Sequence, residues 1–310
     1  MDHFNGRRFF NPTGRNGQPF RNVPRMLFSK RARWPRSVEV EQRVPPPPRG
    51  DIVLTFVGHS TFLIQSAGAT ILTDPVWSNR AGPGLFMGPR RVKAPGVKLE
   101  DLPAISHVLL SHNHYDHCDA STLRSVARRF DPQFITPLGN GALLRACGAK
   151  RIEELDWWGR ASTSSLDVTC TPAQHFSART PFDRNKMLWG GFVITLGARR
   201  IYFVGDSGYA PQFREVPERC GAIDLALMPI GAYEPRWFMQ DIHMNPEEAL
   251  QAHCDCGAKQ SIAMHFGTFQ LTPEAIDDPV TRLRAAMQQR QVPADLFRVL
   301  DVGESFRLNS

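Results

Sequence analysis

The chain has 310 residues, with 37 Lys and Arg against 30 Asp and Glu and a formal net charge of +7. Residues 1–50 hold 11 of the basic and three of the acidic residues, a net charge of +8, whereas residues 51–310 have a net charge of −1. A near-neutral body lacks the cationic face of a nucleic-acid-binding fold. The apolar fraction of 42% excludes global disorder, and no run approaches the ~18 apolar residues of a membrane span.

The first 50 residues differ in composition from the rest of the chain. They are rich in Arg, Pro, Gly and Asn, and Pro45–Pro48 predicts a stiff polyproline II spacer. We therefore divide the chain into a basic, Pro-rich arm (1–50) and a catalytic domain (51–310). Apolar residues within the arm give it some capacity to dock, namely Met26, Leu27, Phe28 and Trp34. A membrane-facing arm and a solvated, loosely packed arm both remain open.

Short apolar runs separated by turns predict strands through the body. The runs are 52–57, 61–65, 69–73, 108–111, 134–136, 166–171, 192–196, 200–204, 225–228, 261–264 and 296–300. Gly197-Ala198 suits a two-residue hairpin. Helices are predicted after Asp119, after Asn245-Pro246 and from Asp278, because each begins with a capping residue. This mixture indicates two sheets covered by helices.

Four metal-binding side chains lie within six residues directly after a predicted strand. In Ser111-His112-Asn113-His114-Tyr115-Asp116-His117, alternate residues of an extended loop project to one side, so His112 and His114 can bind one ion. The next turn can bring Asp116 and His117 to a second ion. Without a metal, burying these groups together would leave costly unpaired polar atoms.

Three more donors follow apolar strands in the same way. His175, Asp206 and His265 each come just after such a run, and strand ends of this kind carry sites on a rigid scaffold. Alone, each would more often be a hydrogen-bonded core residue than a ligand. Together with the 112–117 cluster they supply enough donors for two metals, which can hold a bridging hydroxide for attack at phosphorus or carbon.

The pattern His-x-His-x-Asp-His, followed by distant His, Asp and His, resembles the metallo-β-lactamase superfamily. The resemblance implies an α+β fold, a four-layer αββα sandwich with two metals at one edge. It assigns the first metal to His112, His114 and His175 and the second to Asp116, His117 and His265, with Asp206 as the bridge. Zinc is the expected metal, although iron and manganese suit the same donors.

Longer motifs resemble one branch, the N-acylphosphatidylethanolamine-hydrolysing phospholipase D family. They are Arg8–Pro12, Gly58–Thr61, Leu72–Pro75, Phe86–Arg91, Leu155–Trp158, Asn185–Gly190, Pro229–Met239 and His265–Phe269. That family cleaves a membrane lipid to phosphatidic acid and an N-acylethanolamine. The resemblance therefore implies a phosphodiesterase of phospholipase D type.

The same resemblance assigns further roles in the reaction. Tyr115 corresponds to a residue that contacts the phosphate, His243 to one that binds or protonates beside the metals, and Asp116 to a catalytic ligand. His59 is expected to support the ligands. Arg179 either binds an anionic headgroup or is a solvated surface residue. Leu85 replaces the family's glutamine, a substrate-binding position, and so removes a hydrogen-bond donor.

The sequence and the resemblance also lead to expectations about binding partners and cellular compartment. The partners are a phospholipid or another phosphodiester, a membrane surface contacted through the arm, and a second copy of the chain as the family suggests, but not nucleic acid. Six scattered cysteines without a disulfide framework, and a start without an apolar signal core, favour the cytoplasm. Two alternatives stay open: a lactonase or phosphodiesterase of a soluble metabolite, and a non-catalytic membrane-surface protein.

Overall fold

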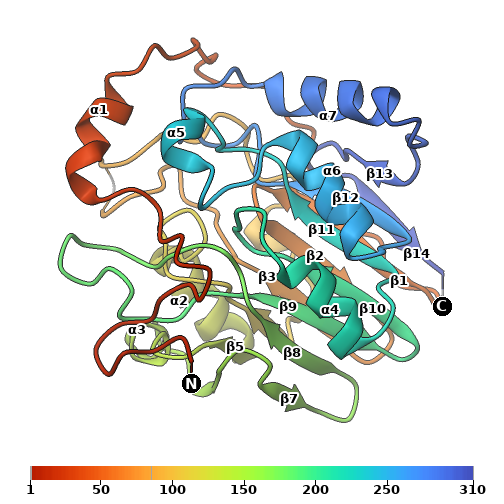
Figure 1. Cartoon of the computed structure of the whole chain (residues 1–310). Coiled ribbons are helices and arrows are strands. Elements are labelled where there is room, and N and C mark those ends of the chain that lie inside the picture. Colours follow the sequence, from red (N-terminus) through yellow and green to blue (C-terminus); the bar gives the residue numbers. More distant parts are fainter. Residues whose placement is uncertain (1, 85, 310) are drawn as a thin grey trace.

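A computed structural model of the chain describes residues 2–84 and 86–309. Two seven-stranded sheets pack face to face (Figure 1). In spatial order the first sheet contains β14 (Ser305–Leu308), β1 (Ile52–Gly58), β2 (Thr61–Gln65), β3 (Thr70–Thr73), β4 (His107–Leu109), β5 (Gln133–Pro137) and β6 (Arg151–Leu155). The second contains β13 (Phe297–Arg298), β12 (Gln260–Met264), β11 (Leu225–Pro229), β10 (Arg199–Phe203), β9 (Gly191–Leu196), β8 (Asp167–Thr171) and β7 (Arg160–Ser162).

Helices cover the outer faces of both sheets (Figure 1). α2 (Ala120–Phe130) and α3 (Gly141–Ala146) lie on the first sheet, and α4 (Gln212–Cys220), α6 (Pro246–Asp255) and α7 (Asp278–Gln289) on the second. The remaining elements are η1 (Phe20–Asn22), α1 (Val23–Leu27), η2 (Leu99–Asp101) and α5 (Arg236–Met239). The predicted αββα sandwich is therefore confirmed. Within the described residues, no helix is long and apolar enough to cross a bilayer.

Two of the three predicted helix starts carry a side-chain cap, whereas α7 begins at Asp278 with Asp277 at its N-cap position and without a side-chain cap hydrogen bond. The Asp119 carboxylate accepts a hydrogen bond from the Ser121 amide at the start of α2. Asn245 and Glu248 form a reciprocal capping box at α6, and Pro246 is the first residue of that helix. Gly197, at φ 59°, turns the chain between β9 and β10.

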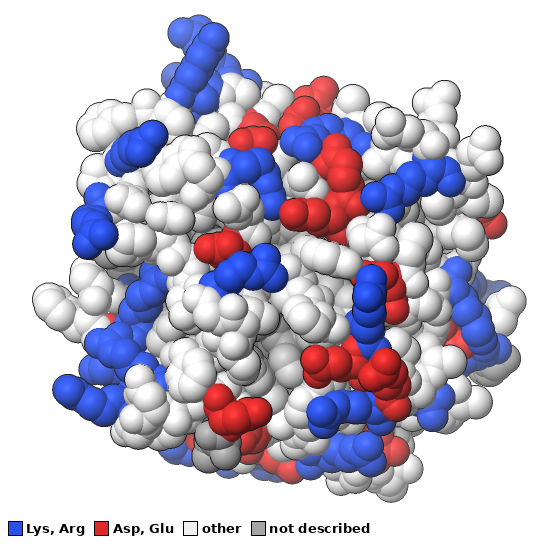
Figure 2. All heavy atoms as spheres, viewed as in Figure 1, with Lys and Arg blue, Asp and Glu red and all other residues white. Residues whose placement is uncertain are grey.

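The N-terminal arm lies on the body over much of its length. Phe9 is buried against Ala173, Leu188 and Trp189, and Asn11 is 2% exposed. In Figure 2, Lys and Arg side chains gather along the left edge of the view, where α1 and the loops below it lie in Figure 1.

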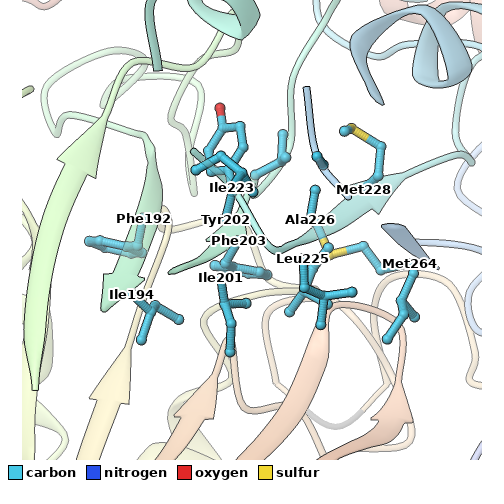
Figure 3. Packing of buried hydrophobic residues seen from close by; sticks show 14 of the residues in the cluster. Phe192, Ile194, Ile201, Tyr202, Phe203, Ile223, Leu225, Ala226, Met228 and Met264 are labelled. Atoms are coloured by element: carbon cyan, nitrogen blue, oxygen red, sulfur yellow. The ribbon is translucent and has the colours of Figure 1, made fainter. Parts of the chain in front are cut away.

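The core follows the alternation of the strands. Phe62 and Ile64 of β2 point between the sheets, whereas Leu63 between them packs under α2 and α3. In the second sheet, Ile201 and Leu225 point toward the first sheet and Tyr202 points away from it (Figure 3). Both faces of each sheet are thus buried, which leaves the loops at the sheet edges free to carry a site.

Candidate metal centre

Strand direction brings the candidate residues to one edge of the sandwich. β1 and β3 both pair antiparallel with β2, and β4 is parallel to β3, so these three strands end at the same edge. By the same reasoning β8, β10 and β12 share a direction. The loops after these strands carry the candidate residues His59, His112, His114, Asp116, His117, His175, Asp206 and His265.

Three imidazoles converge on one point of this edge. His112 and His114 come from the loop between β4 and α2, and His175 from the loop after β8. The His112 Nε2 and His114 Nδ1 atoms are 2.8 Å apart, and His114 Nδ1 is 3.2 Å from His175 Nε2. His175 Nδ1 donates to the Ile242 carbonyl at 2.8 Å, which leaves its Nε2 lone pair free for a metal.

A second group of donors lies beside the first. The Asp116 Oδ2 atom is 3.5 Å from His117 Nε2 and 3.4 Å from His265 Nε2. All three side chains are buried, and with His59 their donor atoms lie within 4.8 Å of one another. This is the set that the resemblance assigns to the second metal.

Asp206 stands between the two groups. Its Oδ2 atom is 3.1 Å from both His117 Nε2 and His265 Nε2, and 3.8 Å from His175 Nε2. Oδ2 is also 3.9 Å from His112 Nε2. One carboxylate therefore faces donors of both groups, as a bridging ligand must.

Asp74 is a functional residue that the sequence reasoning missed. It follows β3, is fully buried, and accepts from His117 Nδ1 at 2.7 Å and from the Ser111 amide at 2.7 Å. The carboxylate fixes the tautomer of His117 and leaves Nε2 as the ligand atom. The motif 72–75 contains Asp74, but a single carboxylate 43 residues before His117 gives no sign of this partner.

The donor set fits divalent metal ions. His117 Nε2, His265 Nε2 and Asp206 Oδ1 are buried and make no hydrogen bond within the described part of the chain. Unpaired buried polar atoms are costly, and a cation between them would satisfy all three. His and carboxylate donors without thiolate suit zinc, iron or manganese.

The electrostatics of the site favour a cation. Burial lowers the pKa of His114 to about 3 and that of His175 to about 4, so these imidazoles are neutral, the form that binds metals. Burial also disfavours charge on His117 and His265. The Asp206 carboxylate nevertheless raises the pKa of His117 well above its usual range and that of His265 to about 9. The centre of the site therefore attracts positive charge.

His59 and His243 flank the donors. The His59 Nε2 atom is 2.9 Å from Asp116 Oδ2, at the distance of a hydrogen bond that would orient this carboxylate. His243 lies in the segment between α5 and α6, with Nε2 3.9 Å from Asp206 Oδ2. Burial holds the pKa of His243 well below its usual range. Its unpaired Nδ1 atom is buried, and the residue lines the cavity described below.

Arg179 does more than either sequence interpretation expected. Its Nη1 atom donates to the carbonyls of Asn113 and Cys118, both at 2.8 Å, and its guanidinium lies 3.8 Å from the centre of the Tyr115 ring. The Tyr115 hydroxyl in turn donates to the Arg179 carbonyl at 3.2 Å. Arg179 thus holds the loop that carries His112, His114, Asp116 and His117, and it also lines the cavity. Leu85 lies outside the described residues.

A cavity of about 450 Å³ opens over the donors. Its floor includes His114, Asp116, Asp206 and His243, and its wall includes Tyr115 and Arg179. The remaining wall is mainly apolar and comes from the arm, α5 and three loops, through Val23, Met26, Phe176, Phe238, Met239, Ile242 and Leu271. A polar floor under apolar walls suits a ligand with a charged reacting group and a long apolar part.

Comparisons with known proteins agree with this geometry. The model of the Beta-lactamase superfamily domain matches residues 69–266. An uncharacterized protein of Mycobacterium tuberculosis is 43% identical over 252 residues, 79% of this chain and 67% of that protein. The N-acyl-phosphatidylethanolamine-hydrolyzing phospholipase D 1 of Caenorhabditis elegans is 38% identical over 265 residues, 81% of this chain and 74% of that protein.

A solved structure carries the same fold. The metallo-beta-lactamase fold protein YhfI from Bacillus subtilis aligns with a TM-score of 0.57 and 16% identity, covering 83% of this chain and 99% of that one. That likeness shows the fold, while the match to the family model, the relatives and the buried His and Asp cluster show the family. The chain belongs to the β-lactamase superfamily and is a metal-dependent hydrolase with the metallo-β-lactamase fold.

Proposed function

We propose that the protein is a two-metal phosphodiesterase of phospholipase D type that cleaves N-acylphosphatidylethanolamine to phosphatidic acid and an N-acylethanolamine. The cavity is the observation that carries this proposal, because buried metal donors lie under apolar walls. A phospholipid has its reacting phosphodiester between a polar headgroup and long acyl chains, and so matches both surfaces. The named Caenorhabditis elegans relative supports the same substrate.

The residues of the cavity floor and wall have different roles in the proposed reaction. Two divalent ions held by the seven donors would neutralise charge on the phosphate and lower the pKa of an attacking water. His243 lies where its imidazole can hydrogen-bond to a phosphate oxygen or to the departing oxygen. Tyr115 and Arg179 face the cavity together and can contact the phosphate from its wall.

Exposed apolar side chains lie in segments that line the cavity or pack beside it. Among the described residues, the exposed large hydrophobic ones are Phe28, Val44, Phe86, Met87 and Phe182. Phe28 lies two residues after Met26 of the wall, and Phe182 directly follows Pro181, which also lines the cavity. Phe86 and Met87 belong to the loop 81–89, whose Ala81 packs in one cluster with Tyr115 and Leu271. We call Phe28, Phe86, Met87 and Phe182 the apolar rim.

The segments that carry this rim are rich in basic residues. These segments, 19–36, 76–93 and 178–187, contain 13 Lys and Arg and one acidic residue. That residue, Asp183, is already paired with the amides of Arg179 and Thr180. Apolar tips among cations favour the anionic surface of a bilayer, where each cation near the surface contributes about 1 kcal/mol. We therefore propose a lipid surface as the partner, contacted by two loops as well as the arm.

Product analysis tests the activity. Metal-loaded protein is incubated with vesicles that contain N-acylphosphatidylethanolamine, and the lipids are identified by mass spectrometry. We expect phosphatidic acid and N-acylethanolamine in equal amounts. No product from protein with bound metal would reject the lipid activity, and turnover of a soluble phosphodiester or lactone instead would favour a soluble substrate.

Substitution of the rim tests the partner. The triple variant Phe28→Ser, Phe86→Ser, Phe182→Ser should bind anionic vesicles about tenfold or more weakly, since insertion of each ring removes apolar area from water. Val44→Ser is the matched control, because Val44 is also exposed but lies in none of the three segments 19–36, 76–93 and 178–187. Equal vesicle binding by wild type and triple variant would show that the rim is not the contact.

A further inference from the structure

The residue His175 is held by the N-terminal arm. The Asn11 Nδ2 atom donates to the main-chain carbonyl of His175 at 2.9 Å and to that of Arg15. Asn11 is 2% exposed, so this bond is shielded from water. The family model begins at residue 69, which places Asn11 outside the part of the chain that defines the superfamily.

Neighbouring residues of the arm fasten the same loop. Phe9 packs into the cluster of Ala173, Leu188 and Trp189, and its amide donates to the Asn185 carbonyl at 2.8 Å. Thr13 Oγ1 donates to the Gln174 side chain at 2.6 Å, and the Gln174 amide group donates to the Arg15 carbonyl. We call residues 9–17 the strap.

The strap also reaches the second group that fixes His175. The Ile242 carbonyl accepts from His175 Nδ1, and a Cβ atom on Gly17 would lie 2.9 Å from Ile242 Cγ2. Gly17, at φ 69°, thus allows the strap to pass directly over Ile242. Asn11, near one end of the strap, binds the main chain of His175. Ile242, whose carbonyl binds the His175 ring, lies under Gly17 at the other end.

We propose that the strap is a positioning element of the metal centre and that Asn11 is its positioning residue, acting through His175. Asn11 touches neither a ligand atom nor the cavity floor. It fixes the backbone from which the imidazole reaches the ions, as outer partners of metal ligands do. The inference rests on the proposed two-metal centre. It predicts an unequal effect, because His175 belongs to the first donor group and not to the second.

Cobalt titration of the purified full chain tests the strap. Wild type, Asn11→Ala, Asn11→Asp and Asn5→Ala are titrated with Co²⁺ against a competing chelator, and binding is followed by visible absorption. Asn11→Asp keeps the shape of the side chain but loses the donor. Asn5→Ala is the control, because Asn5 is exposed and its side-chain oxygen accepts from the amides of Arg7 and Arg8 within the arm.

We expect both Asn11 variants to lose about 10- to 100-fold affinity for one ion and to keep the other within about twofold. The visible spectrum of the weakened site should also change. If each of the two ions binds the Asn11 variants as tightly as it binds wild type, the inference is overturned. Equal weakening of both ions, or a fall in the melting temperature of the metal-free protein together with loss of both, would show a general structural role and also overturn it.

Failure of the two-metal proposal would look different. Wild-type protein that binds a single ion would contradict that proposal. In that case, a lower affinity of Asn11→Ala for that one ion would support the strap inference, and an unchanged affinity would overturn it.

Discussion

The two halves of the donor set are held in different ways. The loop 111–117 carries four donors within six residues and is held by hydrogen bonds to the Asp74 carboxylate and from the Arg179 guanidinium. His175, Asp206 and His265 each come singly, from the ends of three different strands. A short, internally braced loop can be recognised from sequence, whereas the separate donors meet only because the sheets bring their strand ends together.

The Asp206 carboxylate lies between these halves as the proposed bridge, and its loss should have the largest effect. Asp206→Asn keeps the shape of the side chain but removes the charge that faces both donor groups. We expect a loss of metal affinity and hydrolysis beyond the ~100-fold that removal of an outer partner costs. Metal content by elemental analysis and turnover are measured together, and wild-type values for both would refute the bridging role.

Removal of bound metal should lower the thermal stability of the protein, because both parts of the donor set would lose their ligand. Because ions bind the folded site and not the unfolded chain, free metal at 100 times Kd stabilises the fold by ~2.7 kcal/mol. We expect chelation to lower Tm by about 3 °C or more, and added metal to restore it. A Tm that is the same with chelator and with excess metal would contradict a structural contribution from the ions.

Asp74 tests the bracing of the 111–117 loop. Asp74→Asn removes the charge that orients His117 and should lower metal affinity by ~10- to 100-fold. Asp224→Asn is the matched control, because Asp224 is also a buried carboxylate but pairs with Arg199 and Lys259. Metal titration of both variants gives the comparison, and the prediction fails if the two behave alike.

Arg179 should have the smallest effect of the four. Arg179→Met removes the two hydrogen bonds to the loop carbonyls, and bonds from a charged donor contribute about 1.5–3 kcal/mol each. We expect a several-fold fall in turnover with lower thermal stability. Arg129→Met provides the control, since Arg129 donates to the carbonyls of Leu99 and Glu100 elsewhere on the surface. A loss of turnover in the Arg129 variant as large as in the Arg179 variant would argue against a specific clamp.

The strands that the sequence did not predict share one property. β6, β7 and β14 all lie at the edges of their sheets. Edge strands are partly exposed, so Arg151–Leu155 contains two glutamates and Arg160–Ser162 has a single buried residue. Such segments lack the apolar run on which strand prediction depends. The central strands were found because both of their faces are buried.

The outer partners of the metal ligands were the other omission. Asp74, Asn11 and Ile242 hold His117 and His175, yet each is far from its ligand in sequence. Their role depends on which loops meet in space, and no spacing rule encodes that. The sequence reasoning assigned the donors through their residue types, but it had no comparable signal for the groups that orient them.

Hydrolysis in ¹⁸O-labelled water tests the central claim most directly. The protein and N-acylphosphatidylethanolamine are incubated in this water, and the ¹⁸O content of both products is measured by mass spectrometry. Attack of water on phosphorus breaks the bond to the N-acylethanolamine oxygen, so we predict one ¹⁸O in phosphatidic acid and none in N-acylethanolamine. Label in a released fatty acid or in N-acylethanolamine, or no product from protein with bound metal, would contradict the account.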